Sequence, residues 1–225
     1  MTEKKNPTSR TVTATHGKCV FSPDPSAEST MAKHLKENFS RDEILALYSR
    51  YSHGLDSYDS MMRRVLWKAL AQKVGSGLKI GIGVSFKHLE TFNFGNNVFI
   101  GDHAILQGRF DGNAKIEDGS WIGPQAFLDA RELLIGKNVG LGPGVKILGS
   151  VHTGIPTDLP IIETDLEIRP VIIEEEADIG TGAIILPGIK IGKGAIVGAG
   201  AVVNNSVSQY DIVAGIPATF VRKRE

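Results

Sequence analysis

A six-residue repeat runs from residue 173 to residue 208 and restricts this chain to very few folds. Cut every six residues, the segment reads IEEEAD, IGTGAI, ILPGIK, IGKGAI, VGAGAV and VNNSVS. The first position is always Ile or Val, and the fifth is always Ala, Ile or Val. A period of six fits neither the 3.6-residue turn of an α-helix nor the two-residue alternation of a strand. It fits a chain that winds, laying down a short strand and then a corner, again and again.

The repeat also predicts how such a coil packs. Every sixth side chain would point toward one axis, so bulky β-branched residues fill the centre. The fifth residue would lie near a corner, where space is tight and small residues fit. Glycine at the second or fourth position relieves corners that need positive φ, and the 26 glycines exceed ordinary usage. Because each turn buries its face only against its neighbours, we expect a mainly β fold with many turns.

The repeat extends upstream in a weaker form. The six-residue step is kept by Ile82, His88, Phe94, Ile100 and Leu106, and the fifth position by Phe86, Phe92, Val98, Ala104 and Phe110. The phase slips through DGNAK, resumes at Ile116, Ile122 and Leu128, slips again, and resumes at Ile135, Leu141 and Ile147. Such slips indicate bulges or loops at corners. The sequence therefore predicts a β-helix over residues 78–209. His88 falls at a core position and is expected to be packed or at the end of a coil, and His103 is expected on the surface.

The residues before the repeat predict a helical cap over 30–77. Ser40 and Glu43 form a capping box before ILALYSRY, which predicts a short helix. A second helix is expected from about Tyr58 to Val74, with a solvated face made by Arg63, Arg64 and Lys68. These helices would cover the open end of the coil, whose edge would otherwise pair with other chains. Residues 1–29 are rich in Lys, Ser, Thr and Pro and are expected to form a flexible arm.

Composition excludes several classes of function. The chain has 25 basic and 25 acidic side chains, so no net field draws it to nucleic acid or to an anionic membrane. The single cysteine, Cys19, excludes an intrachain disulfide and is typical of a reducing compartment. The polar start MTEKKNPTSR argues against a signal peptide, and no apolar run approaches the ~18 residues of a membrane span. We expect a cytoplasmic protein.

The repeat stops at His152. Residues 153–170, TGIPTDLPIIETDLEIRP, have no six-residue period and contain three prolines. This segment is too long for a plain corner, and long excursions from a regular scaffold are disproportionately functional. After the last hexapeptide the chain leaves the predicted coil in a tail, residues 210–225, which contains AGIPATFVRKR.

Together, the histidine before an extruded segment, the hexapeptides behind it and the tail resemble the hexapeptide-repeat acyltransferases. The tail is similar to the pattern A-G-x-P-A-[KR]-x-[IV]-[RK] of that family. The resemblance covers about residues 60–225. It points to the galactoside, maltose and nodulation-factor O-acetyltransferases and to enzymes of surface-polysaccharide biosynthesis. It implies a left-handed parallel β-helix with three hexapeptides per coil, and a homotrimer with active sites between subunits.

The resemblance implies that His152 is the general base of an acetyl-CoA-dependent O-acetyltransferase. Transfer to a hydroxyl needs a base, a donor for the developing oxyanion and a held thioester. Histidine can be neutral near physiological pH and can then accept a proton. The thioester is already activated, so no covalent intermediate on the protein is needed, and the chain lacks a G-x-S-x-G motif. The alternative is that His152 packs in the core or only orders the segment behind it.

The family's coenzyme A contacts carry over to Thr181, Ala199, Asn204, Asn205, Thr219 and Arg222. Departures from the family pattern are Asn204-Asn205 in place of Thr-Lys, Thr219 in place of a basic residue, and Asp178 in place of the aromatic residue of V-W-I-G. Lys223 or Arg224 would supply the missing charge. A small residue such as Ala199, flanked by two glycines, would let the pantetheine arm approach the backbone.

On the acceptor side, galactoside acetyltransferases carry two neighbouring aspartates one coil before the histidine. This chain has Asp129 followed by Ala130. We expect Asp129 and Arg131 to face the acceptor cleft, with a solvated surface as the alternative. The missing second aspartate argues against a simple galactoside or maltose acceptor.

Three other functions are compatible with such a coil. The first is an N-acetyltransferase acting on an amino-sugar nucleotide. The second is a zinc lyase like the γ-type carbonic anhydrases, in which three histidines converge. Side chains align at steps of eighteen residues in such coils, and His88, His103 and His152 do not keep that spacing, so no metal is expected. The third is a non-catalytic β-helix that serves in assembly.

Overall fold

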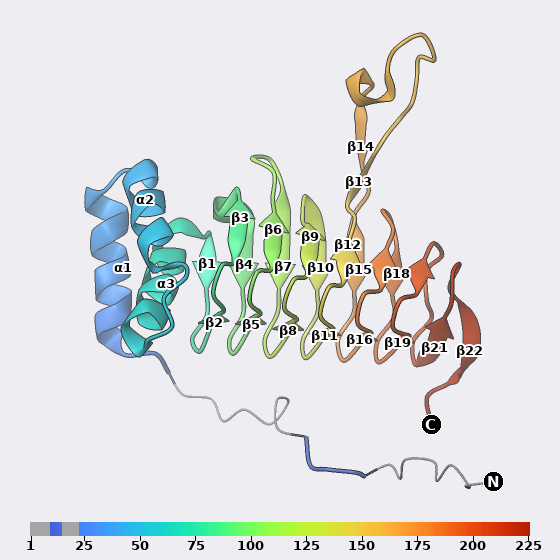
Figure 1. The fold of residues 1–225 in the computed structure, drawn as a ribbon, viewed down its shortest axis with the longest axis horizontal. Coiled ribbons are helices and arrows are strands. Elements are labelled where there is room, and N and C mark those ends of the chain that lie inside the picture. The colour runs from blue at the N-terminus through green and yellow to red at the C-terminus, as the bar shows by residue number, and fades with distance from the viewer. Residues whose placement is uncertain (1–9, 15–22) are drawn as a thin grey trace, which may run out of the picture.

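The structure is a computed structural model that describes residues 10–14 and 23–225. Three helices, α1 (Ser26–Asn38), α2 (Arg41–Tyr51) and α3 (Ser57–Leu70), stand at one end of a long coil of short strands (Figure 1). Cys19 and most of the expected flexible arm, residues 1–29, lie outside the described residues. The mainly β fold with an N-terminal helical cap is as predicted.

The coil has three faces, and successive turns supply neighbouring parallel strands to each face. Face A contains β1 (Lys73–Val74), β4 (Phe92–Phe94), β7 (Asn113–Ile116), β10 (Glu132–Ile135), β15 (Val171–Ile173) and β18 (Lys190–Ile191). Face B contains β2 (Lys79–Ile80), β5 (Phe99–Ile100), β8 (Trp121–Ile122), β11 (Gly140–Leu141), β16 (Asp178–Ile179), β19 (Ile196–Val197), β21 (Asp211–Ala214) and β22 (Thr219–Lys223). Face C contains β3 (Ser85–Lys87), β6 (Ile105–Gln107), β9 (Phe127–Asp129), β12 (Lys146–Ile147), β17 (Ile184–Ile185) and β20 (Val202–Val203). The predicted parallel β-helix is therefore confirmed.

The core follows the six-residue repeat through the C-terminal coils. All six predicted first-position residues are buried: Ile173, Ile179, Ile185, Ile191, Val197 and Val203. They pair from one turn to the next, as Ile173 does with Ile191 on face A and Ile185 with Val203 on face C. Burying a side chain of this size contributes about 1.5–3 kcal/mol, so the stacked rungs form the main apolar core.

One corner of the coil differs from the other two. From face A to B and from B to C, the core position advances by six residues, as from Ile116 to Ile122 to Leu128. From face C to A the step is longer in the first four turns, as from Leu106 to Ile116 and from Leu128 to Ile135. We call this corner the C–A edge and the corner between faces B and C the B–C edge. The register breaks inferred from the sequence are thus concentrated on the C–A edge.

The first coil corrects the predicted phase. Ile82 was expected in the core, and His88 either there or at the end of a coil, but Ile80 is buried in the core and Phe86 packs partly against the same cluster. His88 lies at the C–A edge with a φ of 54°, followed by the 3-10 turn η1 (Leu89–Thr91). The six-residue step does not hold across this extra turn, so core positions inferred by counting back from Phe94 are wrong by two residues.

The boundaries of the cap also differ from those predicted. Helix α1 was not expected, and it begins inside the segment 1–29. Helix α3 ends at Leu70 rather than near Val74, and β1 already starts the coil there, ahead of the predicted start at residue 78. At the far end, β21 and the antiparallel β22 continue face B through the expected tail.

The basic residues of α3 do not form a solvated face, because Arg63 is buried and acidic side chains from α1 and the residues before it pair with the other two. Arg64 Nη2 lies 2.7 Å from Oε1 of Glu28, whose side chain is buried. Lys68 Nζ lies 2.7 Å from Oδ2 of Asp24, and Asp24 Oδ1 also accepts a hydrogen bond from a backbone N–H of the first coil. Burial tends to raise the pKa of Asp24, but the hydrogen bond from Lys68 and this backbone bond outweigh it and lower the pKa.

Two buried polar side chains join the cap to the coil. Arg63 Nε donates to the carbonyl oxygen of Ile80 at 3.0 Å, and its Nη1 donates to two carbonyls at the end of α2 and beyond. Tyr48 of α2 donates its hydroxyl to the carbonyl oxygen of Val84 at 2.8 Å. Burial raises the pKa of Tyr48 to about 12, so the hydroxyl stays a donor. These bonds fix the helices over the open end of the coil.

Candidate active site

The extruded segment is a two-stranded arm rather than an open loop. Strand β13 (Ser150–His152) leaves the C–A edge after β12 and pairs antiparallel with β14 (Leu166–Ile168). The short 3-10 turn η2 (Ile161–Glu163) lies between them, and the arm projects well beyond the coil (Figure 1). His152 is therefore an exposed residue of the arm and not the last residue of a coil.

The hydrogen bond of His152 defines its tautomer. Its Nδ1 lies 3.0 Å from the carbonyl oxygen of Thr164 across the arm. A carbonyl can only accept, so Nδ1 carries the proton and Nε2 of the neutral ring presents a lone pair. The hydroxyl of Thr164 in turn donates to the carbonyl of Ile161 and accepts from the N–H of Gly154. The ring is thus oriented as a general base requires, by a turn that is itself hydrogen-bonded.

Asp129 holds the root of this arm. Its Oδ2 accepts from the hydroxyl of Ser150 at 2.7 Å and from the N–H of Gly149 at 3.3 Å. Its Oδ1 accepts from Nε of Arg131 at 2.8 Å, and the Asp129 side chain is buried. The neighbouring Ala130 is fully buried. The carboxylate expected to face an acceptor thus accepts hydrogen bonds from the start of the strand that carries His152.

The residues expected to contact coenzyme A lie in three places. Thr181 and Ala199 occupy successive turns of the B–C edge, both exposed, where Gly200 N–H donates to the Thr181 carbonyl at 2.8 Å. Asn204 and Asn205 follow β20 on the C–A edge and are also exposed.

Thr219 and Arg222 lie on β22 at the end of face B. Both are exposed, and Arg222 Nη1 donates only to the carbonyl of Lys223 among the hydrogen bonds of the described residues. Asp178 lies on β16, the strand of face B that leads into the corner with Thr181. Burial raises the pKa of Asp178, and the charge of Arg224 partly opposes that shift. The tail thus places its cationic groups beside the last turns of face B.

Face C separates the predicted base from part of the predicted donor site. His152 and the asparagine pair belong to the C–A edge, whereas Thr181 and Ala199 belong to the B–C edge. One chain therefore does not bring all the predicted site residues together. Thr164, which orients His152, was not found from the sequence, because it acts through its backbone carbonyl and such a role has no residue signature.

No group of three His, Cys, Asp or Glu side chains that could hold a metal ion occurs in the part of the chain that the structure describes. His103 lies at a corner with a φ of 57° and is exposed, as predicted. Within residues 10–14 and 23–225, no helix has the length and apolar character needed to cross a membrane.

Comparison with known sequences finds acetyltransferases. A protein of Schizosaccharomyces pombe, named provisionally as an acetyltransferase, is 39% identical over 100 residues, which are 44% of this chain and 47% of that protein. A 2,3,4,5-tetrahydropyridine-2,6-dicarboxylate N-acetyltransferase of Staphylococcus aureus is 41% identical over 88 residues, 39% of this chain and 32% of that one. The chain thus spans less than half the length of these relatives. No protein-family model matches it.

Solved structures share the fold over more of the chain. A maltose O-acetyltransferase from Clostridium difficile covers 88% of this chain and 97% of its own, with a TM-score of 0.59 and 25% identity. A mutant of the Bacillus cereus N-acyltransferase AntD, in complex with dTDP-4-amino-4,6-dideoxyglucose and coenzyme A, covers 72% of this chain and 89% of its own, with a TM-score of 0.64 and 25% identity. Relatives named as acetyltransferases and neighbours with the same coil confirm the resemblance of this chain to the hexapeptide-repeat acyltransferases.

Proposed function

We propose that this protein moves an acetyl group from acetyl-CoA to a hydroxyl of a sugar or surface-glycan precursor, with His152 as the general base. The observation that carries the proposal is the hydrogen bond from His152 Nδ1 to the Thr164 carbonyl, which leaves Nε2 free to accept a proton. The acetyltransferase relatives and the coenzyme A complexes of the structural neighbours support the donor.

The reaction has two steps, addition and collapse, and one group can accept the proton in the first and return it in the second. Nε2 takes the proton of the acceptor hydroxyl as that oxygen attacks the thioester carbonyl. The tetrahedral oxyanion then collapses, the carbon–sulfur bond breaks, and the leaving thiolate takes the proton back from the imidazolium. The products are an acetyl ester and free coenzyme A, and His152 is neutral again. No metal takes part in this scheme.

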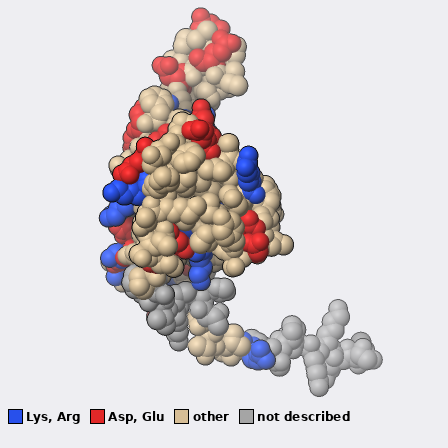
Figure 2. Space-filling view, turned by 90° about the vertical axis from the view of Figure 1, so that its left-hand side faces the viewer, with Lys and Arg blue, Asp and Glu red and all other residues tan. Residues whose placement is uncertain are grey.

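The proposed site is completed by a second copy of the chain. Because face C separates His152 from Thr181 and Ala199, a base from one subunit and a donor edge from another supply what one chain lacks. The exposed apolar side chains of the arm support this arrangement, among them Ile155 and Ile162, which are 72% and 81% exposed. Figure 2 shows that the arm's tip is acidic. We propose a homotrimer with active sites between subunits, which light scattering at micromolar concentration tests; a stable monomer would contradict it.

N-acetylation of an amino-sugar nucleotide is the second candidate function. It is favoured by the AntD complex, whose acceptor is an amino sugar on dTDP, and by the relatives named as N-acetyltransferases. The same Nε2 would serve an amine, so the geometry of His152 is compatible with both acceptors. The chemistry of the product separates them, since an ester is cleaved by mild alkali and an amide is not.

A thiol-release assay with acetyl-CoA tests the proposal against matched sugars, amino sugars and their nucleotide forms. We expect coenzyme A release with a sugar acceptor and an alkali-labile acetyl group on the product, checked by mass spectrometry. An alkali-stable product would establish the amine as the acceptor. Failure of the intact protein to bind coenzyme A in calorimetry would refute the donor. The cytoplasm stays the predicted location.

A further inference from the structure

The C–A edge carries a second insertion besides the arm. Between β6 and β7 the chain adds a short excursion, Arg109–Gly112, which accounts for the register slip seen through DGNAK. Extra residues at this corner are not needed for winding, because a later turn passes the same edge with a six-residue step, from Ile185 to Ile191. The excursion therefore calls for an explanation other than the fold.

The excursion presents an ordered aromatic ring. Phe110 is 69% exposed, and Cζ of Arg109 lies 5.0 Å from its ring centroid. Arg109 Nε is held 2.6 Å from Oδ1 of Asp111, and the ring of His88 meets the phenyl ring edge-on at 6.3 Å. His88 is itself held 2.9 Å from Glu90. A ring fixed by such neighbours loses little freedom when a ligand stacks on it.

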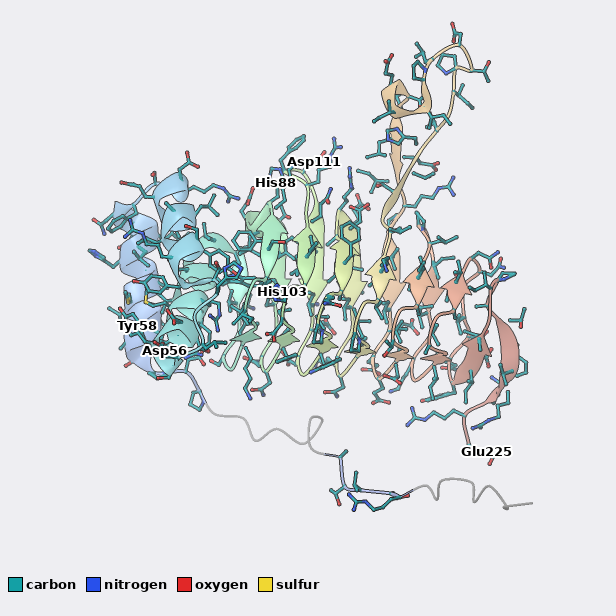
Figure 3. The ribbon with its side chains drawn as sticks, viewed as in Figure 1. Asp56, Tyr58, His88, His103, Asp111 and Glu225 are labelled. Atoms are coloured by element: carbon teal, nitrogen blue, oxygen red, sulfur yellow. The ribbon has the colours of Figure 1, made fainter. Side chains whose placement is uncertain are left out.

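This ring lies in line with the proposed base. Strands β6, β9 and β12 are successive rungs of face C, and rungs of a sheet are ~4.8 Å apart. The excursion after β6 is therefore about 10 Å along the C–A edge from the root of the arm after β12. Figure 3 shows His88 and Asp111 together at the edge from which the arm projects. The rung between them carries the ion pair of Asp129 and Arg131.

The chemistry of this row suits a carbohydrate. The C–H faces of a sugar ring are apolar and stack on a phenyl ring, and its hydroxyls pair with carboxylate and guanidinium groups. A phosphate or another anion fits less well, because the carboxylates paired with Arg109 and Arg131 neutralise the charge of both guanidinium groups of the row.

We propose that the acceptor is an oligosaccharide that lies along the C–A edge, with its reacting residue at His152 and a more distant sugar ring stacked on Phe110. The proposal rests on the proposed transfer to a sugar, and it adds how long the acceptor is and in which direction it lies on the protein. Acceptors of two to four residues should then be used better than the corresponding monosaccharide.

The test uses malto- and chito-oligosaccharides of one to four residues with the full-length protein. In F110A, kcat/KM for the longer acceptors should fall about three- to tenfold, while the monosaccharide changes less than about twofold. F110W should restore the longer acceptors. L55A, which removes an exposed apolar side chain (85%) from the cap, is the matched control and should change neither.

Several outcomes would overturn the proposal. They are an equal loss for short and long acceptors in F110A, a wild-type protein that does not prefer longer acceptors, and an F110A protein with an altered oligomeric state. The last would make Phe110 an interface residue. Calorimetry separates this proposal from the proposed function: oligosaccharide binding that depends on Phe110 without acetyl transfer would keep the binding edge and refute the transferase.

Discussion

The C-terminal coils, residues 171–203, and the N-terminal coils, residues 73–147, share one architecture but differ at one corner. Both stack parallel rungs around the same buried axis. In the C-terminal coils every corner takes the regular step, whereas in the N-terminal coils the C–A edge carries η1, the Arg109–Gly112 excursion and the arm. An insertion at a corner leaves the rungs in register, whereas one inside a strand would turn its side chains to the other face. The core can therefore stay uniform while the length of the chain at one edge varies.

The largest effect is expected where the interrupted edge carries the proposed base. His152→Ala should lower kcat by about 10²–10⁴-fold, because proton transfer by a positioned side chain contributes that much. Coenzyme A affinity should change little, because His152 lies on the arm and not among the residues proposed to contact coenzyme A. Steady-state kinetics and calorimetry measure both.

His103→Ala is the control for this substitution, because His103 is an exposed histidine at a corner of the regular type. It should leave kcat unchanged. A folded His152→Ala protein with wild-type kcat would place the base elsewhere and remove the main functional contrast between the edges.

The two halves also differ in how much of them the sequence predicts. The phase of the C-terminal coils is correct at every rung, because six clean copies of the repeat reinforce one another. In the first coil the phase is lost at η1, since one extra turn shifts all positions counted through it. Helix α1 was missed because its apolar signal is weak: it buries Ala32 and Leu35, while Glu28 is held by an ion pair with a helix distant in sequence.

The second effect tests whether the cores of the two halves are equally well packed. Ile122→Ala and Ile179→Ala each remove a fully buried side chain from face B, one in each half. Both should lower the free energy of unfolding by about 2–5 kcal/mol, through lost burial and the cavity left behind. Denaturant unfolding checks this. A clearly smaller loss of unfolding free energy in Ile122→Ala than in Ile179→Ala would show that corner insertions weaken the packing of the rungs beside them.

The third effect is expected at the root of the arm. Asp129→Ala removes the acceptor of the Ser150 and Gly149 hydrogen bonds and leaves Arg131 without its carboxylate. A loss of about 1–3 kcal/mol is typical for such a buried group, and here it should lower kcat because the strand that carries His152 loses its tether.

Asp118→Ala is the matched control on the corner between faces A and B, where Asp118 accepts from the N–H of Asn96 at 2.7 Å. It should cost stability but not kcat. Equal kcat values for the two variants would show that Asp129 does not position the arm.

The sequence suggested candidate residues for the site but not the contacts that hold them. The arm and His152 are visible in the sequence because the repeat stops there. The hydrogen bond to Thr164 is not, because any residue supplies a carbonyl. The hydrogen bonds of Asp129 were also missed, because their partners Gly149 and Ser150 lie one coil further along the chain. Which residues become neighbours on successive coils depends on how many residues each corner holds.

The smallest effect is expected at the end of the regular half. Arg222 is exposed on β22, so solvent screens any pairing with a phosphate, and Arg222→Ala should weaken coenzyme A binding by only about threefold. Pantetheine, which lacks the nucleotide phosphates, is the control ligand, and calorimetry should find its affinity unchanged by the substitution. Raising the salt concentration should reduce the difference between wild type and variant, because screening weakens exposed charge pairs. An unchanged coenzyme A affinity at low salt would exclude Arg222 from the donor site and leave Lys223 and Arg224 as the cations of the tail.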